Sequence, residues 1–96
     1  MTKIFELACR LGVESLQKFA YPNKTTSYSV FEFTSSHPDV LQLVETRIGI
    51  NGGEKETIRV RIPPRNQYGN AIVYVFAVDQ DEKVFECMQF KIKYGD

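Results

Sequence analysis

The sequence has little of what catalytic, metal-binding or nucleic-acid-binding domains usually require. Its 96 residues include one histidine and two cysteines, and twelve Lys and Arg residues balance twelve Asp and Glu residues. A zero formal net charge argues against a domain whose affinity comes from neutralising phosphates, so nucleic acid is not an expected partner.

Long hydrophobic runs are also absent. No apolar run approaches the length of about 20 residues that crosses a bilayer, and the N-terminus lacks the basic-then-apolar layout of a signal peptide. We therefore expect a soluble, unexported domain without membrane insertion. At 96 residues the chain is expected to be a single domain over residues 1–96, cut from a longer protein, with a core large enough to fold without metal or disulfides.

The two cysteines, Cys9 and Cys87, are too few for a disulfide framework and lack the spacing of zinc ligands. We expect both to be reduced, with Cys9 as a small core hydrophobe. The alternative is a disulfide between the first and last strands, which would require an oxidising compartment.

Catalytic and cofactor sites are not expected. The single histidine, His37, precedes a proline in a polar loop, and no glycine-rich oxyanion turn or nucleophile elbow accompanies it. The acidic cluster Asp79, Asp81 and Glu82 has too few ligands for a full calcium cage, so an acidic hairpin tip is favoured over a metal site. We predict no enzyme, no cofactor, no metal and no small-molecule substrate.

Strand-like runs separated by turn residues predict a small all-β sandwich. An alternating run ends at Pro22-Asn23, where proline cannot donate to a strand ladder and asparagine favours a turn. Asn23-Lys24-Thr25 also matches the N-glycosylation pattern, but a structural turn is the stronger interpretation. Counting similar runs gives about seven antiparallel strands. The clear runs lie at residues 3–11, 16–21, 28–34, 57–62, 71–78 and 84–94, and a short apolar segment at 40–44 leads to Ile48 and Ile50. A short helix at 13–19 is the alternative for the start of the second run.

Alternation within these runs predicts which side chains form the core. We expect the core to include Phe19, Tyr21, Phe31, Phe33, Ile58, Val60, Ile62, Met88, Phe90, Ile92 and Tyr94. The strand that carries Arg59 and Arg61 and the strand that carries Lys91 and Lys93 are expected to lie in opposite sheets. No single basic stripe is therefore expected.

The strand at 71–78 is apolar in both phases and is therefore expected to be central. We expect the phase of Val73 and Val75 to face outward and to bind a protein partner, because soluble monomers rarely leave a large apolar patch bare. The alternative is that a loop or a neighbouring domain of the parent protein covers this face. Lys91 and Lys93 at its edge would steer acidic segments toward it. The predicted partner-binding residues are Val30, Val73, Val75, Phe85, Lys91 and Lys93.

Several segments resemble a known family. They include Tyr21-Pro22-Asn23-Lys24-Thr25, Ser36-His37-Pro38-Asp39, Gly52-Gly53-Glu54 and Ile58-Arg59-Val60-Arg61-Ile62. In this order they resemble the immunoglobulin-like, major-sperm-protein-type domains, and most closely the C-terminal domains of the nephrocystin-4 family. The resemblance implies an immunoglobulin-like β-sandwich. It also implies a scaffold of the ciliary transition zone or basal body, located in the cytoplasm at the base of the cilium or flagellum or on the associated cytoskeleton.

The function expected from residues and resemblance together is a non-enzymatic protein–protein interaction module of a ciliary scaffold. Its partners would be proteins, including other ciliary scaffold proteins. The alternative is a secreted or cell-surface adhesion β-sandwich.

Overall fold

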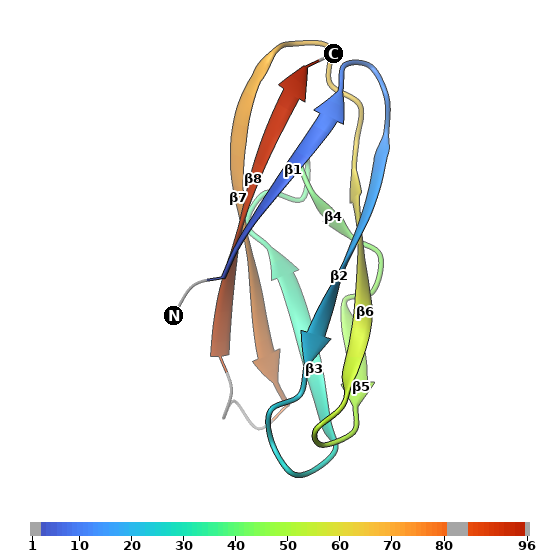
Figure 1. The fold of residues 1–96 in the computed structure, drawn as a ribbon, viewed down its shortest axis with the longest axis vertical. Coiled ribbons are helices and arrows are strands. Elements are labelled where there is room, and N and C mark those ends of the chain that lie inside the picture. Colours follow the sequence, from blue (N-terminus) through green and yellow to red (C-terminus); the bar gives the residue numbers. More distant parts are fainter. Residues whose placement is uncertain (1–2, 81–84, 96) are drawn as a thin grey trace.

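A computed structural model describes residues 3–80 and 85–95, with all side chains in these ranges except that of Phe85. The described chain forms eight strands in two sheets (Figure 1). One sheet has the order β1-β8-β7-β3-β5 and the other the order β2-β6-β4. The strands are β1 (Lys3–Arg10), β2 (Ser15–Pro22), β3 (Ser29–Ser35), β4 (Gln42–Leu43), β5 (Arg47–Ile50), β6 (Lys55–Ile62), β7 (Gly69–Asp79) and β8 (Phe85–Gly95).

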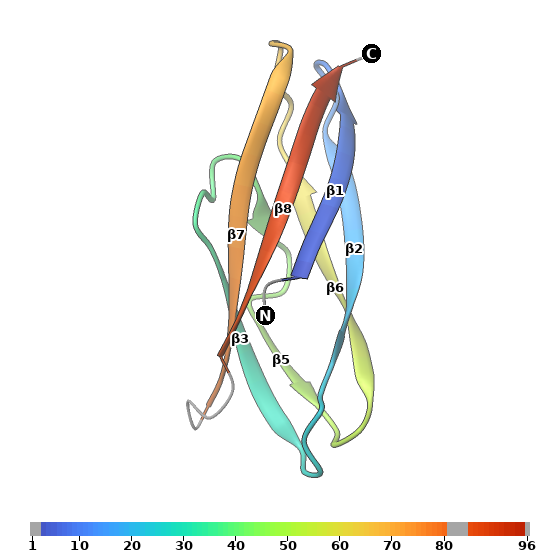
Figure 2. The same ribbon diagram turned by 60° about the vertical axis from the view of Figure 1, so that its left-hand side comes forward.

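The two sheets face each other along an elongated molecule of 44 × 21 × 18 Å (Figure 2). The predicted all-β, immunoglobulin-like sandwich is confirmed, with β7 at the centre of the five-stranded sheet. Two details differ from the prediction. The short strand β4 adds an eighth element, and β1 pairs with β8 in parallel, whereas the other pairs are antiparallel. No helix capable of spanning a membrane occurs within residues 3–80 and 85–95.

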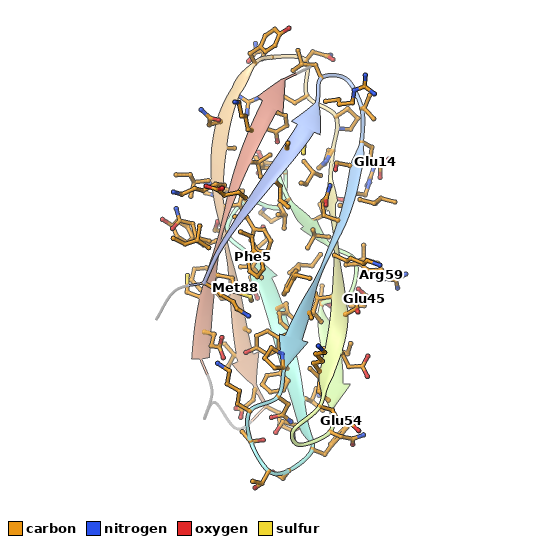
Figure 3. All side chains as sticks on the ribbon, in the orientation of Figure 1. Phe5, Glu14, Glu45, Glu54, Arg59 and Met88 are labelled. Atoms are coloured by element: carbon orange, nitrogen blue, oxygen red, sulfur yellow. The ribbon has the colours of Figure 1, made fainter. Side chains whose placement is uncertain are left out.

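Aromatic side chains from both sheets meet between them, and all the predicted core residues are buried. Phe5 of β1, labelled in Figure 3, stacks on Phe90 of β8 with ring centroids 4.9 Å apart. Its ring lies 5.4 Å from that of Phe19 of β2. Tyr21 of β2 meets Phe31 and Phe33 of β3 edge-on, at 5.3 and 5.2 Å. Such pairs contribute beyond the area they bury, so the inward aromatic residues of β2 join the smaller sheet to the larger one.

The start of β2 is a strand, so the helical alternative for residues 13–19 is wrong. β2 pairs antiparallel with β6 from Ser15, and Phe19 lies opposite the buried Ile58. A helix would have placed Val13, Leu16 and Phe19 on one face, but Val13 and Leu16 are exposed and only Phe19 is buried. Pairing with β6 satisfies the backbone of this segment and fixes the side-chain phase.

The two cysteines, Cys9 and Cys87, are not bonded to each other in the structure. Cys9 of β1 is buried in the core, opposite the buried Tyr94 of β8. Cys87 of β8 lies opposite Phe76 of β7 and belongs to the other face of the same sheet. Because side chains alternate across a strand, the two thiols point to opposite sides of the sheet, which explains why the disulfide alternative does not form.

Candidate functional site

The predicted outward phase of β7 is wrong. Val73 and Val75 are each 0% exposed and lie in the core between the sheets. β7 pairs with β8 so that Val73 lies opposite Phe90 and Val75 opposite Met88, and both of these partners are buried. Residues opposite one another in a ladder point to the same side of the sheet, so the inward residues of β8 fix the inward phase of β7.

The outer face of the five-stranded sheet carries the other phase of β7. Ile72 is 49% exposed and Tyr74 is 38% exposed. Gln89 of β8 lies opposite Tyr74, and on the far side of Gln89 lies Ile4 of β1, which is 54% exposed. We call Ile4, Ile72 and Tyr74 the outer patch. The sheet therefore has exposed apolar side chains on its outer face, but they are not the predicted valines, Val73 and Val75.

Lys91 and Lys93 are the predicted site residues that the structure brings to the outer patch. Lys91 lies directly opposite Ile72, and Lys93 lies opposite Asn70. Together with Glu6 of β1 these residues line a hollow of about 510 Å³ on the sheet surface. The hollow combines an exposed aliphatic side chain with two ammonium groups.

Of the remaining two predicted site residues, the one whose side chain the structure describes does not join this hollow. Val30 is half-buried and lies opposite Gly49 of β5. The Gln80 N–H donates to the Val30 carbonyl at 2.9 Å, so Val30 is level with the end of β7, whereas Ile72 is near its start. The side chain of Phe85 lies outside the described residues. Two of the six predicted residues, Lys91 and Lys93, thus lie beside the outer patch.

The arginines of β6 lie on the other sheet, as predicted, and their charges are paired there. Arg59 forms an ion pair with Glu45, and Arg61 forms one with Glu14 (Figure 3 labels Glu14, Glu45 and Arg59). The hydrogen bond from the Arg59 guanidinium lowers the pKa of the Glu45 carboxyl below its ordinary value. These pairs are partly exposed, so they stabilise the fold only weakly, but they compensate both arginine charges of β6.

Asn23 is a structural residue of the turn after β2. Its side chain is 1% exposed, and its Nδ2 donates to the carbonyls of Ser27 at 3.0 Å and Ile50 at 2.9 Å. Its Oδ1 accepts from the Thr25 N–H at 3.0 Å and from the Thr25 hydroxyl at 2.7 Å. All donors and acceptors of the amide are therefore used within the fold. The geometry supports the structural interpretation of Asn23-Lys24-Thr25 rather than a glycan acceptor.

Among the described residues, those with potential catalytic or metal chemistry are dispersed. His37 is exposed, and its Nδ1 lies 2.8 Å from the Ser36 hydroxyl. Within residues 3–80 and 85–95, no group of three His, Cys, Asp or Glu residues is placed to hold a metal ion. Asp79 is buried, whereas Asp81 and Glu82 lie outside the described residues. Burial, followed by the nearby Glu86 charge, raises the pKa of Tyr21, so this buried phenol stays protonated.

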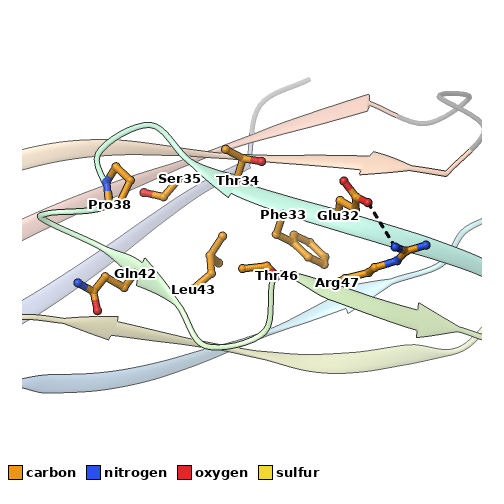
Figure 4. A pocket seen from close by; sticks show the side chains of 9 residues that line it. All are labelled: Glu32, Phe33, Thr34, Ser35, Pro38, Gln42, Leu43, Thr46 and Arg47. Carbon is orange, nitrogen blue, oxygen red and sulfur yellow. Dashed lines mark ion pairs between the residues drawn. The ribbon is translucent and has the colours of Figure 1, made fainter.

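A second hollow, of about 720 Å³, lies between the two sheets where the chain leaves β3, crosses to β4 and returns to β5 (Figure 4). Phe33 and Leu43 line it, and Glu32 and Arg47 form its rim near β5, with Arg47 Nη1 3.9 Å from Glu32 Oε1. Sequence reasoning missed this opening. The sequence feature that marks this place is the polar stretch at residues 35–39 after β3. It shows where the chain leaves the sheet, but it does not show which strand edges then face each other.

Similar proteins support one family. The sequence model of the family described as NPH4 Ig-like domain 4 matches residues 2–95. Human nephrocystin-4 is 28% identical over 96 residues, which cover 98% of this chain and 7% of that protein. The chain thus spans only a small part of the curated relative that it matches, and the activity of the whole relative does not transfer directly.

Solved structures with little sequence identity share the fold. The ASH/PapD-like domain 7 of human CEP192 has a TM-score of 0.65 at 11% identity, covering 100% of this chain and 82% of that chain. SSP-19, an MSP-domain protein like family member of Caenorhabditis elegans, has a TM-score of 0.66 at 7% identity, covering 91% and 92% of the two chains. Since the family model matches nearly the whole chain, the chain belongs to the NPH4 Ig-like domain 4 family.

Proposed function

We propose that this chain is a non-enzymatic protein–protein interaction domain of a scaffold at the ciliary transition zone or basal body. The similarity to nephrocystin-4 supports the ciliary setting. A domain that spans 7% of its relative suits a module within a larger scaffold.

The outer patch is the observation that carries the interaction role. The patch combines Ile4 of β1 with Ile72 and Tyr74 of β7. The strand pairing places Ile4 and Tyr74 on either side of Gln89 of β8. Exposed apolar groups gathered on one sheet face are typical of protein-binding surfaces. Aromatic and aliphatic side chains supply the binding energy of such surfaces, whereas charged residues at the edge mainly increase the association rate. Lys91 and Lys93 would therefore steer an acidic partner surface toward the patch.

The experiment compares variants of the tagged full-length parent protein in ciliated cells. We expect the wild type at the base of the cilium. Ile72→Asp combined with Tyr74→Asp should reduce this localisation and the proximity labelling of neighbouring ciliary proteins several-fold. Leu16→Asp is the matched control, because Leu16 is also exposed but lies on the smaller sheet.

Two results would overturn the proposal. One is a parent protein that is absent from the ciliary base. The other is a double variant that behaves like the Leu16→Asp control. Labelling of the parent by a membrane-impermeant biotin reagent on intact cells would instead support the adhesion alternative. Circular dichroism of the isolated chain should show both proteins folded, since exposed surface substitutions usually change stability by about 0.5 kcal/mol or less.

A further inference from the structure

The opening between β3 and β4 is bordered by a strand edge that is only half covered. Residues of β3 alternate in the direction of their backbone groups. The Gln80 N–H donates to the Val30 carbonyl at 2.9 Å and the Ser36 N–H donates to the Tyr74 carbonyl at 2.8 Å. Even-numbered residues of β3 therefore bond to β7, and the backbone groups of odd-numbered residues point toward β5 and the opening.

β5 occupies only the first part of this edge. Its register with β3 runs from Ser29 to Glu32, and the last bond on this side is from the Phe33 N–H to the Thr46 carbonyl at 2.8 Å. Beyond it, the Phe33 carbonyl and the N–H and carbonyl of Ser35 have no backbone partner among the described residues. Phe33 and Ser35 both line the hollow of about 720 Å³ and are labelled in Figure 4.

The facing edge of β4 is open in the same way. The Val44 N–H donates to the Arg59 carbonyl at 3.0 Å, so Val44 and Gln42 bond to β6. By alternation, the N–H and carbonyl of Leu43 point away from β6, and Leu43 lines the hollow. The hollow therefore has backbone donors and acceptors on both walls and the side chains of Phe33 and Leu43 at its apolar base.

We propose that this opening binds an extended peptide segment of a partner protein by strand addition. The segment would lie in line with β5, bond to Phe33 and Ser35 along the open edge of β3, and place one β-branched apolar side chain between Phe33 and Leu43. Only an extended main chain offers alternating donors and acceptors that match a strand edge, because the backbone groups of a helix are already bonded internally. The volume lies within the roughly 300–1,000 Å³ of typical ligand clefts.

This site is separate from the outer patch and does not depend on it. The outer patch lies on the exposed face of the sheet, whereas the opening lies at a sheet edge between the two layers. Each proposal can therefore fail alone.

The test uses an acetylated and amidated Thr-Val-Thr-Val-Thr peptide as the probe, titrated into the isotope-labelled 96-residue chain. Saturable shifts of the Ser35 and Leu43 amide signals are expected at up to millimolar peptide, with slowed exchange of both amides. The matched probe has the same sequence with every internal amide N-methylated, and it should bind at least tenfold more weakly because it cannot donate to a strand edge.

Protein variants localise the binding. Ser35→Pro removes an N–H that faces the opening and is not used by β7, and Leu43→Asp places a charge at the apolar base; each should weaken binding at least tenfold. Leu16→Asp on the smaller sheet should bind as the wild type does. If Leu43→Asp does not fold, Ser35→Pro and the N-methylated probe still decide the outcome.

The proposal is overturned if no saturable shift occurs, or if the N-methylated probe binds equally well. It is also overturned if the shifts centre on Ile72, Tyr74 and Lys91, which would instead assign the peptide to the outer patch.

Discussion

Replacing Asn23 by alanine should unfold the domain at a much lower temperature than replacing its neighbour Lys24. The buried Asn23 amide makes four hydrogen bonds, to Ser27, Ile50 and twice to Thr25. Each is worth about 0.5–1.5 kcal/mol net, and the partner groups left unpaired add a desolvation cost. The Thr25 hydroxyl can still bond to the Ser27 carbonyl at 3.0 Å, so we expect a total loss of about 3 kcal/mol in the free energy of unfolding.

For a domain of this size, a loss of about 3 kcal/mol lowers the melting temperature by roughly 12–24 °C. Thermal and urea unfolding followed by circular dichroism measure the change. Lys24→Ala is the control, because Lys24 is exposed in the same turn and should change stability by about 0.5 kcal/mol or less. Thr25→Ala should fall between the two variants. If Asn23→Ala loses less than about 1 kcal/mol, the buried amide does not hold this turn and the reasoning is refuted.

Three further outcomes follow from the core, the thiols and the charges. Ile58→Ala should lower the free energy of unfolding by about 2–5 kcal/mol in urea titrations, because it leaves a cavity in the core; a change below about 1 kcal/mol would contradict its placement. Reductant should leave the melting temperature unchanged, since Cys9 and Cys87 face opposite sides of the sheet, and a clear drop would show a bridge. In the folded protein the pKa of Glu45 lies below its ordinary 4.5. The bond between Glu45 and Arg59 therefore stabilises the fold above pH 4.5, and this stabilisation disappears as the pH falls through the pKa that Glu45 has in the folded protein. Wild type should therefore lose slightly more stability than Glu45→Gln between about pH 6 and pH 3, and equal losses would show that the pair contributes nothing.

The sequence predicts the strands well wherever one phase is polar. In β6, Arg59 and Arg61 alternate with buried isoleucine and valine, and in β8 Lys91 and Lys93 mark the outer face. A lysine or arginine in the inward phase would carry a large desolvation cost, so such patterns permit one orientation only.

The sequence of β7 alone cannot fix its phase, because Ile72 and Tyr74 are as apolar as Val73 and Val75. The register decides it: Val73 lies opposite Phe90 in β8, and the lysines of β8 already determine which way Phe90 points. Combining the phase of one strand with the pairing of its neighbour would have corrected the predicted site. A strand with two apolar phases therefore has to be interpreted together with its partners.

The opening beside β4 could not be predicted for a different reason. It depends on two edges, Phe33 to Ser35 in β3 and Leu43 in β4, which face each other only after the chain has crossed between the sheets. Composition and alternation describe single strands and contain no information on how far β5 covers its neighbour. The distance over which two strands stay paired is set by the turn between them and by packing in the whole sandwich.

The parallel pairing of β1 with β8 determines how the domain would respond to mechanical load. A pull on the chain before β1 and after β8 acts along both strands in opposite directions, so it slides them past each other instead of peeling them apart. All the ladder bonds along the 8 residues of β1 are then strained together. An antiparallel terminal pair would open one bond at a time from the end. Since forced unfolding depends on the rate of barrier crossing rather than on equilibrium stability, this arrangement resists tension even in a domain of modest thermal stability.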